Sequence, residues 1–165
     1  LEQAVRALPE YFDIDTELLQ KTAHRIMSDT IEKLVKNPDI ISMDRARQEK
    51  VLENIFKENK FAQLAVIVDR EGNKNTDIFL RSGRISPEDE QKLDKNYAKR
   101  AWFIVPYENG HMHITSLFQS KITGLLGVTV SAPIFKNDEI VGVIRLDCKY
   151  EDLLKASREE IEINY

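Results

Sequence analysis

The sequence predicts an α+β domain in which a five-stranded antiparallel sheet carries a long N-terminal helix on one face and a binding pocket on the other. Three observations lead to this prediction: a helical stripe of apolar residues comes first, two apolar segments rich in β-branched residues follow, and three more such segments come after a polar insert. The length of 165 residues and the 42% hydrophobic content suit one globular domain with a single core. We assign it to residues 15–165 and treat residues 1–14, which lack a clean period, as a leader of uncertain order.

Two helices are predicted at the N-terminal end from the spacing of apolar residues. Residues 18–35 place their apolar side chains on one helical face, with Asp15 or Thr16 available as the N-cap and Pro38 beyond the end. A second amphipathic helix is expected over residues 43–59. Both helices precede the first strand.

Five strands are expected from apolar, β-branched segments bounded by turn residues. They cover residues 61–68, 76–80, 113–118, 126–135 and 139–148. The first is almost continuously apolar, which is typical of a central strand covered on both faces. A short helix is predicted from Ser86 toward Asn96, because Pro87 and several acidic residues follow a good N-cap. A final helix is expected from about Glu151.

Composition and motifs exclude several classes of function. The net charge of −4 provides no basic footprint, so we expect no nucleic-acid partner. No stretch reaches the roughly 18 apolar residues that a membrane span needs. The sequence lacks a Gly-rich phosphate loop and a nucleophile elbow, and His111 and His113 lack the further ligands of a metal site. We therefore expect neither catalysis nor a cofactor.

Polar residues gather on one face of the last two strands. Alternation along each strand places Thr129 and Ser131 opposite the neighbouring valines, and it places Arg145 and Asp147 opposite Ile144 and its apolar partners. If the apolar faces cover the long helix, the four polar side chains lie toward the insert and line a pocket there. The alternative is a solvated face, which is common in antiparallel sheets.

The segment Lys99-Arg100-Ala101-Trp102-Phe103 supplies a cation and large aromatic rings to the same region. The fork of donors on Arg100 suits a carboxylate, and the carboxylate of Asp147 suits an ammonium group. The alternative for Arg100 is a surface ion pair with an acidic residue of the preceding helix. The alternative for Asp147 is a pair with Arg145.

In order and spacing, these segments resemble the Cache domain, the PAS-like extracytoplasmic sensor module of bacterial chemoreceptors, sensor histidine kinases and cyclic-dinucleotide signalling proteins. The resemblance covers most of the chain. It is carried by the long first helix and by the segments Arg100-Ala101-Trp102-Phe103, Thr129-Val130-Ser131-Ala132-Pro133-Ile134 and Ile140-Val141-Gly142-Val143-Ile144-Arg145-Leu146-Asp147. It implies that Arg100 and Trp102 contact a ligand carboxylate and that Asp147 takes an amino group.

The sequence also departs from the family pattern. Phe103 lacks the hydroxyl of the frequent Tyr, Ala101 replaces a frequent Pro, and Ser116-Leu117-Phe118 stands where many members have Asp-Pro-Tyr. Two hydroxyl contacts typical of amino-acid binders are therefore absent, so a short organic acid is as well supported as an amino acid.

We therefore expect a ligand-binding sensory domain of a bacterial transmembrane signalling protein. Its predicted ligand-binding residues are Arg100, Trp102, Phe103, Phe118, Thr129, Ser131, Arg145 and Asp147. The resemblance implies a periplasmic location in an inner-membrane protein, flanking membrane helices outside this segment and a homodimer in the intact receptor. Two alternatives are a ligand-free PAS-like interaction or dimerisation module and a cytoplasmic PAS-type sensor.

Overall fold

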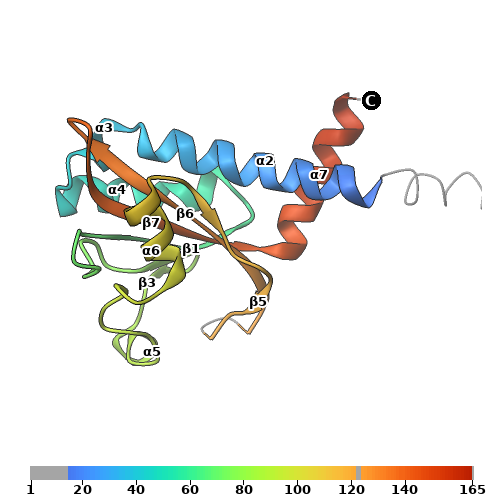
Figure 1. Ribbon diagram of the computed structural model, residues 1–165. Coiled ribbons are helices and arrows are strands. Elements are labelled where there is room, and N and C mark those ends of the chain that lie inside the picture. Colours follow the sequence, from blue (N-terminus) through green and yellow to red (C-terminus); the bar gives the residue numbers. More distant parts are fainter. Residues whose placement is uncertain (1–14, 122–123, 165) are drawn as a thin grey trace, which may run out of the picture.

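A computed structural model describes residues 15–121 and 124–164, and the expected leader at 1–14 lies outside the described residues. The helices are α2 (Thr16–Val35), α3 (Pro38–Ile41), α4 (Arg45–Glu58), α5 (Pro87–Glu90), α6 (Ala101–Asn109) and α7 (Tyr150–Asn164). The strands are β1 (Ala62–Val68), β2 (Phe79–Leu80), β3 (Gly83–Arg84), β4 (His113–Ile114), β5 (Phe118–Gln119), β6 (Leu126–Lys136) and β7 (Glu139–Lys149). The predicted α+β class, with the long helix against an antiparallel sheet, is confirmed (Figure 1).

All strands belong to one sheet of order β3-β2-β1-β7-β6-β4, with β5 also paired to β6. Every pairing is antiparallel, and β7 lies between β1 and β6. The predicted strand at 113–118 is split into β4 and β5, and the predicted strand at 76–80 keeps only its last two residues. The loss at 76–80 has a local cause: Asn75 and Thr76 both donate their backbone N–H to the carbonyl of Ile67, which forms a turn instead of a ladder.

Two helix boundaries differ from the prediction. Pro38 lies beyond the end of α2, as expected, but it also starts α3, where the side chain of Asn37 accepts a hydrogen bond from the backbone N–H of Asp39. Helix α5 ends at Glu90 rather than near Asn96. The side chain of Asn96 instead donates to the carbonyl of Glu71 and to Asn73, so this part of the insert is fastened to the turn after β1.

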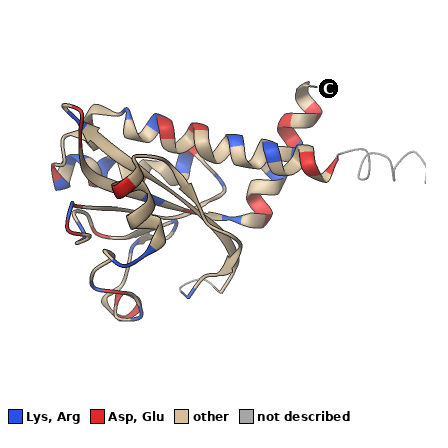
Figure 2. Cartoon of the chain, in the orientation of Figure 1, with Lys and Arg blue, Asp and Glu red and all other residues tan. Residues whose placement is uncertain are grey.

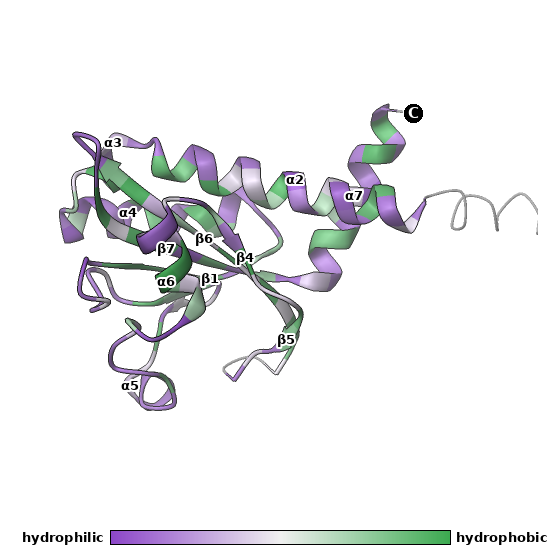
Figure 3. Cartoon of the chain, viewed as in Figure 1, coloured by the Kyte–Doolittle hydropathy of each residue, from purple (hydrophilic) through white to green (hydrophobic). Residues whose placement is uncertain are grey.

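The sheet separates two layers of apolar packing. On one side, Ile144 and Leu146 of β7 and Val130 of β6 pack with α2 and α4 in the main core. On the other side, Val143 packs with the aromatic residues at the start of α6 in a smaller cluster. Figure 3 shows α6 and the central strands as mostly hydrophobic, whereas α2 alternates along its length. The predicted apolar face of the two late strands is confirmed, and the opposite face carries Thr129, Arg145 and Asp147 beside this smaller apolar cluster.

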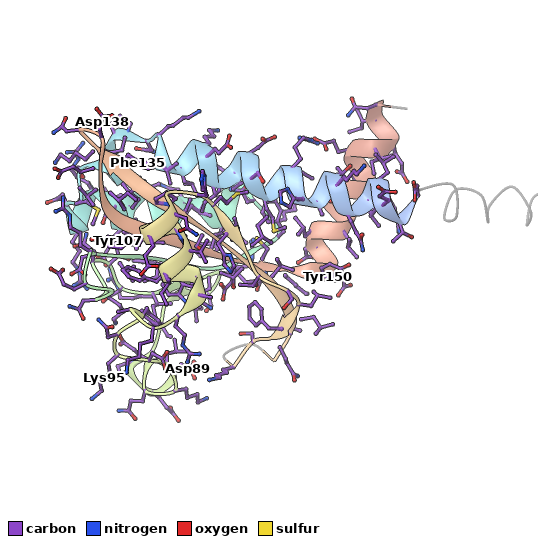
Figure 4. All side chains as sticks on the ribbon, in the orientation of Figure 1. Asp89, Lys95, Tyr107, Phe135, Asp138 and Tyr150 are labelled. Carbon is purple, nitrogen blue, oxygen red and sulfur yellow. The ribbon has the colours of Figure 1, made fainter. Side chains whose placement is uncertain are left out.

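Helix α7 follows β7 without a loop, since Lys149 ends the strand and Tyr150 begins the helix (Figure 4). It packs against α2, and Arg25 of α2 forms an ion pair with Glu160 of α7. Acidic and basic positions are interspersed along α2, α7 carries mainly acidic ones, and the late strands are largely uncharged (Figure 2). None of the helices in the described ranges is long and apolar enough to cross a bilayer.

A charged network fastens α4 to the edge of the sheet and leads to a prediction about acid stability. Asp77 accepts hydrogen bonds from Arg45 and Arg84, and Glu49 pairs with both arginines. Burial raises the pKa of Asp77, but the hydrogen bonds and charges of Arg84 and Arg45 outweigh it and hold that pKa below its ordinary value of 3.8. The stability contributed by the ionised carboxylate is therefore present above about pH 4 and lost as the pH falls through the lowered pKa.

Asp77→Asn should lower the free energy of unfolding at pH 7 by about 0.5–1 kcal/mol, because the two guanidinium partners are half exposed. The difference from the parent protein should shrink at pH 3, where the parent also begins to lose the charge. Urea unfolding at both pH values measures this. Asp89→Asn, in an exposed pair with Lys92, is the control and should change little at either pH.

Candidate functional site

A cleft of about 370 Å³ opens on the face of the sheet opposite α2. Its floor is formed by β6 and β7, and its walls by the start of α6, the segment 93–97 and the segment 115–121 that includes β5. Apolar and aromatic side chains supply much of the wall: Leu64, Leu93, Tyr97, Trp102 and Phe118. This is the position predicted for the pocket, between the sheet and the insert.

Three of the predicted site residues form the polar floor. The strand register places Thr129 directly opposite Asp147. The hydroxyl of Thr129 donates to Oδ1 of Asp147 at 2.7 Å. Arg145 donates from Nε to the same oxygen at 2.8 Å and from Nη2 to Oδ2 at 3.0 Å. Asp147 is therefore paired with Arg145, which is the alternative that the sequence left open.

The guanidinium of Arg145 is held from two sides. It pairs with Asp147 along one edge and lies 5.1 Å from the centroid of the Trp102 ring. Burial lowers the pKa of Arg145, but the charge and hydrogen bonds of Asp147 outweigh it, so the net pKa is raised and the group is a permanent cation. Only 20% of the Arg145 side chain and 9% of the Asp147 side chain are exposed.

Arg100 lies at the rim of the cleft. It is the N-cap residue of α6, and its Nε donates to Asp94 at 2.5 Å. The hydrogen bond from Arg100 lowers the pKa of Asp94, and the same contact raises the pKa of Arg100. Half of the Arg100 side chain is exposed. The predicted surface ion pair therefore exists within the cleft wall, although Asp94 comes from a loop and not from the preceding helix.

The remaining predicted residues divide between the cleft and the packing behind it. Trp102 and Phe118 line the cleft. Phe103 does not: it is 4% exposed and stacks on Tyr107 with the ring centroids 5.3 Å apart. Both residues belong to the small apolar cluster, but successive residues of α6 point in different directions, so only Trp102 also reaches the cleft.

Ser131 is also absent from the cleft wall, and its role is to anchor α6. Its hydroxyl donates to the backbone carbonyl of Trp102 at 2.6 Å. In a regular helix that carbonyl would accept from the residue four positions later, but this residue is Pro106, which has no N–H. Ser131 therefore supplies the hydrogen bond that the proline removes, and it fixes the start of α6 on the sheet.

Ser131→Ala should lower the free energy of unfolding by about 1–3 kcal/mol, because the buried Trp102 carbonyl would lose its donor. The matched control is Ser157→Ala. Ser157 is equally buried, and its hydroxyl donates at 2.7 Å to the carbonyl of Leu153, which keeps its helical backbone partner. Urea unfolding of the two variants compares them directly. Equal losses in both would contradict the special role of Ser131.

Several cleft residues escaped the sequence reasoning. Tyr97 is buried, packs 5.0 Å from the Trp102 ring and has its phenol pKa raised by burial. Thr115, Asp94 and Lys121 add to the polar part of the wall, together with Ser116, Gln119 and Ser120. The signal for Tyr97 was a single aromatic residue in an otherwise polar loop shortly before Arg100. Nothing in the local pattern marked Thr115 or Asp94, whereas Lys121 lies in the loop before a predicted strand, from which a side chain can close over a ligand or simply form a polar turn.

Metal binding finds no support in the described parts of the chain. No group of three or more histidine, cysteine, aspartate or glutamate residues gathers there in an arrangement able to hold an ion. Cys148 lies in the main core, and burial raises the pKa of its thiol. The groups that the cleft offers to a ligand are therefore cations, carboxylates and aromatic rings.

Comparison with solved structures shows the same fold in chemoreceptor sensory domains. The sensory domain of the Campylobacter jejuni chemoreceptor Tlp3 with isoleucine bound matches with a TM-score of 0.61 and 16% identity, covering 86% of this chain and 60% of that one. The ligand-binding domain of the Pseudomonas aeruginosa amino acid chemoreceptor PctC in complex with GABA matches with a TM-score of 0.58 and 23% identity, covering 83% and 60%. The ligand-binding domain of the Pseudomonas fluorescens chemoreceptor CtaA with L-serine matches with a TM-score of 0.61 and 16% identity, covering 90% and 62%.

One sequence relative has the name of an enzyme and not of a chemoreceptor. A protein named citrate (Re)-synthase, from Syntrophus aciditrophicus, is 32% identical over 157 residues. The match covers 94% of this chain and only 25% of that protein. The chain thus spans about a quarter of this relative and about three fifths of the solved sensory domains.

The family comparison agrees with the fold and with the resemblance to Cache domains. The model of the family described as methyl-accepting chemotaxis protein-like, first PDC sensor domain, matches residues 48–155. This range includes the whole sheet, the cleft and the start of α7. Since the match covers well over half of the chain, the protein belongs to the family of PDC sensor domains of the methyl-accepting chemotaxis type.

Proposed function

We propose that this sensor domain binds a small carboxylate-bearing metabolite, an organic acid or an amino acid, in the cleft between the sheet and α6. The charge of the cleft carries the proposal: Arg100, Lys121 and Arg145 outnumber the carboxylates of Asp94 and Asp147. A volume of about 370 Å³ is within the usual range for small-molecule sites. The aromatic walls would exclude water around the bound molecule.

The cleft also argues for ligand binding rather than a purely structural role. A ligand-free interaction module would be expected to fill this region with side chains, and a PAS-type sensor for a large cofactor would need a more apolar cavity. The solved sensory domains that hold isoleucine, GABA and L-serine support small metabolites of the same size class. The domain has no catalysis of its own in this proposal.

The connection between β7 and α7 suggests how binding is transmitted. Arg145 and Asp147 lie on the strand that continues directly into α7, and α7 packs on α2. A ligand that prefers one arrangement of the cleft would shift the relative position of these two helices by its differential affinity for the two states. In the intact protein, we propose, the helices continue into membrane spans of a dimeric receptor, and the domain lies outside the cytoplasm.

A thermal-shift panel of short organic acids and amino acids tests the binding proposal. A ligand at 100 times its dissociation constant should stabilise the domain by about 2.7 kcal/mol. The control variant is Ser116→Trp, which fills the cleft mouth from an exposed position without removing a charge. Stabilisation by a panel member that this variant abolishes supports the cleft. Stabilisation that is equal in both proteins would overturn it.

The relative named citrate (Re)-synthase favours a second candidate, in which the domain is a ligand-binding regulatory part of a larger enzyme. The supporting observation is that the match covers nearly all of this chain but only a quarter of that relative. The other three quarters of the relative remain for other functions. Fractionation of cells that produce the full-length natural protein discriminates the two. Recovery with the membranes supports the receptor, and recovery in the soluble fraction supports the enzyme-linked domain.

A further inference from the structure

We infer that the cleft selects carboxylates that lack an ammonium group, because Arg145 already supplies the cation that Asp147 would otherwise take from the ligand. The inference rests on the proposed function and specifies its ligand class. In it, the outer edge of the Arg145 guanidinium is the carboxylate subsite, and Asp147 is a positioning residue that holds this guanidinium in place.

The hydrogen bonds of Asp147 support the first half of the inference. An ionised carboxylate offers about four acceptor positions. Thr129 and the Nε of Arg145 use two on Oδ1, and the Nη2 of Arg145 uses one on Oδ2. The charge is balanced by the guanidinium at hydrogen-bond distance. An incoming ammonium group would therefore find one acceptor position and no uncompensated charge.

The donors of Arg145 support the second half. A guanidinium has five N–H donors. One on Nε and one on Nη2 face Asp147, while no partner among the described residues takes those on Nη1. Arg145 lines the cleft, and its contact with Trp102 and its bidentate pair with Asp147 prevent it from swinging away. The outer edge is thus a preorganised fork of the kind that binds carboxylates.

The other charged groups of the cleft also favour a carboxylate without an ammonium group. The carboxylate of Asp94, from the segment before α6, is paired with Arg100. Lys121, from the segment after β5, adds a cation. Both cleft carboxylates are therefore paired with arginines, and an α-ammonium group would enter a site with excess positive charge. A plain carboxylate gains from the same excess.

Matched pairs of ligands test the inference by isothermal titration calorimetry. Succinate and L-aspartate differ only by the ammonium group, as do propionate and L-alanine. In the parent protein, the deaminated member of the pair that binds should do so at least tenfold more tightly. Arg145→Gln removes the cation but keeps an amide donor beside Asp147, so it should reverse the preference toward the amino acid.

Arg100→Gln is the matched control, since it makes the same chemical change at the rim. It frees Asp94 only at the exposed rim, so it should weaken both members of a pair and leave the plain acid as the tighter ligand. If Arg145→Gln does not fold, the double variant Arg145→Met/Asp147→Ala removes both charges and should abolish the discrimination against ammonium.

The outcomes separate this inference from the function on which it rests. Binding of L-aspartate or L-alanine as tightly as the deaminated partner, blocked by Ser116→Trp, would overturn the inference and leave the cleft as the binding site. A panel with no binder at all would overturn both. Preference for the plain acid in the parent, with reversal in Arg145→Gln alone, supports both.

Discussion

Asp147→Ala is expected to lower the free energy of unfolding by about 3–5 kcal/mol, the range for removing one partner of a buried ion pair. The variant would leave the Arg145 guanidinium, with only a fifth of its side chain exposed, without its counter-charge. It would also remove the acceptor of the Thr129 hydroxyl. Urea denaturation with linear extrapolation measures the loss.

The double variant Arg145→Met/Asp147→Ala is the control for this prediction. It removes both charges and keeps an apolar chain against the Trp102 ring. Most of the stability should return, because the desolvation cost of the guanidinium disappears together with its partner. A double variant as unstable as Asp147→Ala would show that the loss arises from packing rather than from an uncompensated charge.

Gly72→Ala is expected to cost about 2–4 kcal/mol of stability and to weaken ligand binding. Gly72 has a φ of +81°, which costs an L-residue about 1–2 kcal/mol. An added Cβ would also lie 2.6 Å from the backbone nitrogen of Ala98, so the backbone must move. The carbonyl of Gly72 accepts from the N–H of Tyr97, and a shift there displaces a wall of the cleft. Urea unfolding and titration with the best panel ligand measure the two effects.

Gly110→Ala separates backbone strain from the clash. Gly110 has a similar φ of +70°, but an added Cβ would meet only a Phe135 ring atom at 3.7 Å. It should cost about 1–2 kcal/mol and leave ligand affinity unchanged. If both glycine variants lose the same stability, the contact with Ala98 does not constrain the loop.

The fold and the floor of the cleft were predictable because both follow from alternation. In a strand the side-chain period is two, so the placement of Thr129, Arg145 and Asp147 on one face required only the correct strand direction and register. The apolar character of the opposite face then located the long helix. The choice between an ammonium site and an internal pair for Asp147 was not predictable, because it depends on side-chain rotamers.

The walls were less predictable because they come from irregular segments. Phe103 and Trp102 are adjacent in sequence, and only the helical path of α6 sends one behind the wall and the other into it. Ser131 lies on the predicted face, but the carbonyl freed by Pro106 takes its hydroxyl. Tyr97 and Asp94 reach the cleft through a loop whose course depends on the bond from Asn96 to Glu71, a contact between residues far apart in the chain.

The pairing of Arg145 with Asp147 also bears on the lifetime of the protein in the cell. A binding site with an uncompensated buried charge would favour unfolding and proteolysis whenever the ligand is scarce. Here the charges of Arg145 and Asp147, on the same strand, balance each other, so the empty domain carries no unpaired buried charge. Ligand binding should therefore add only its own binding free energy to the stability of the folded domain, without also relieving an unpaired buried charge.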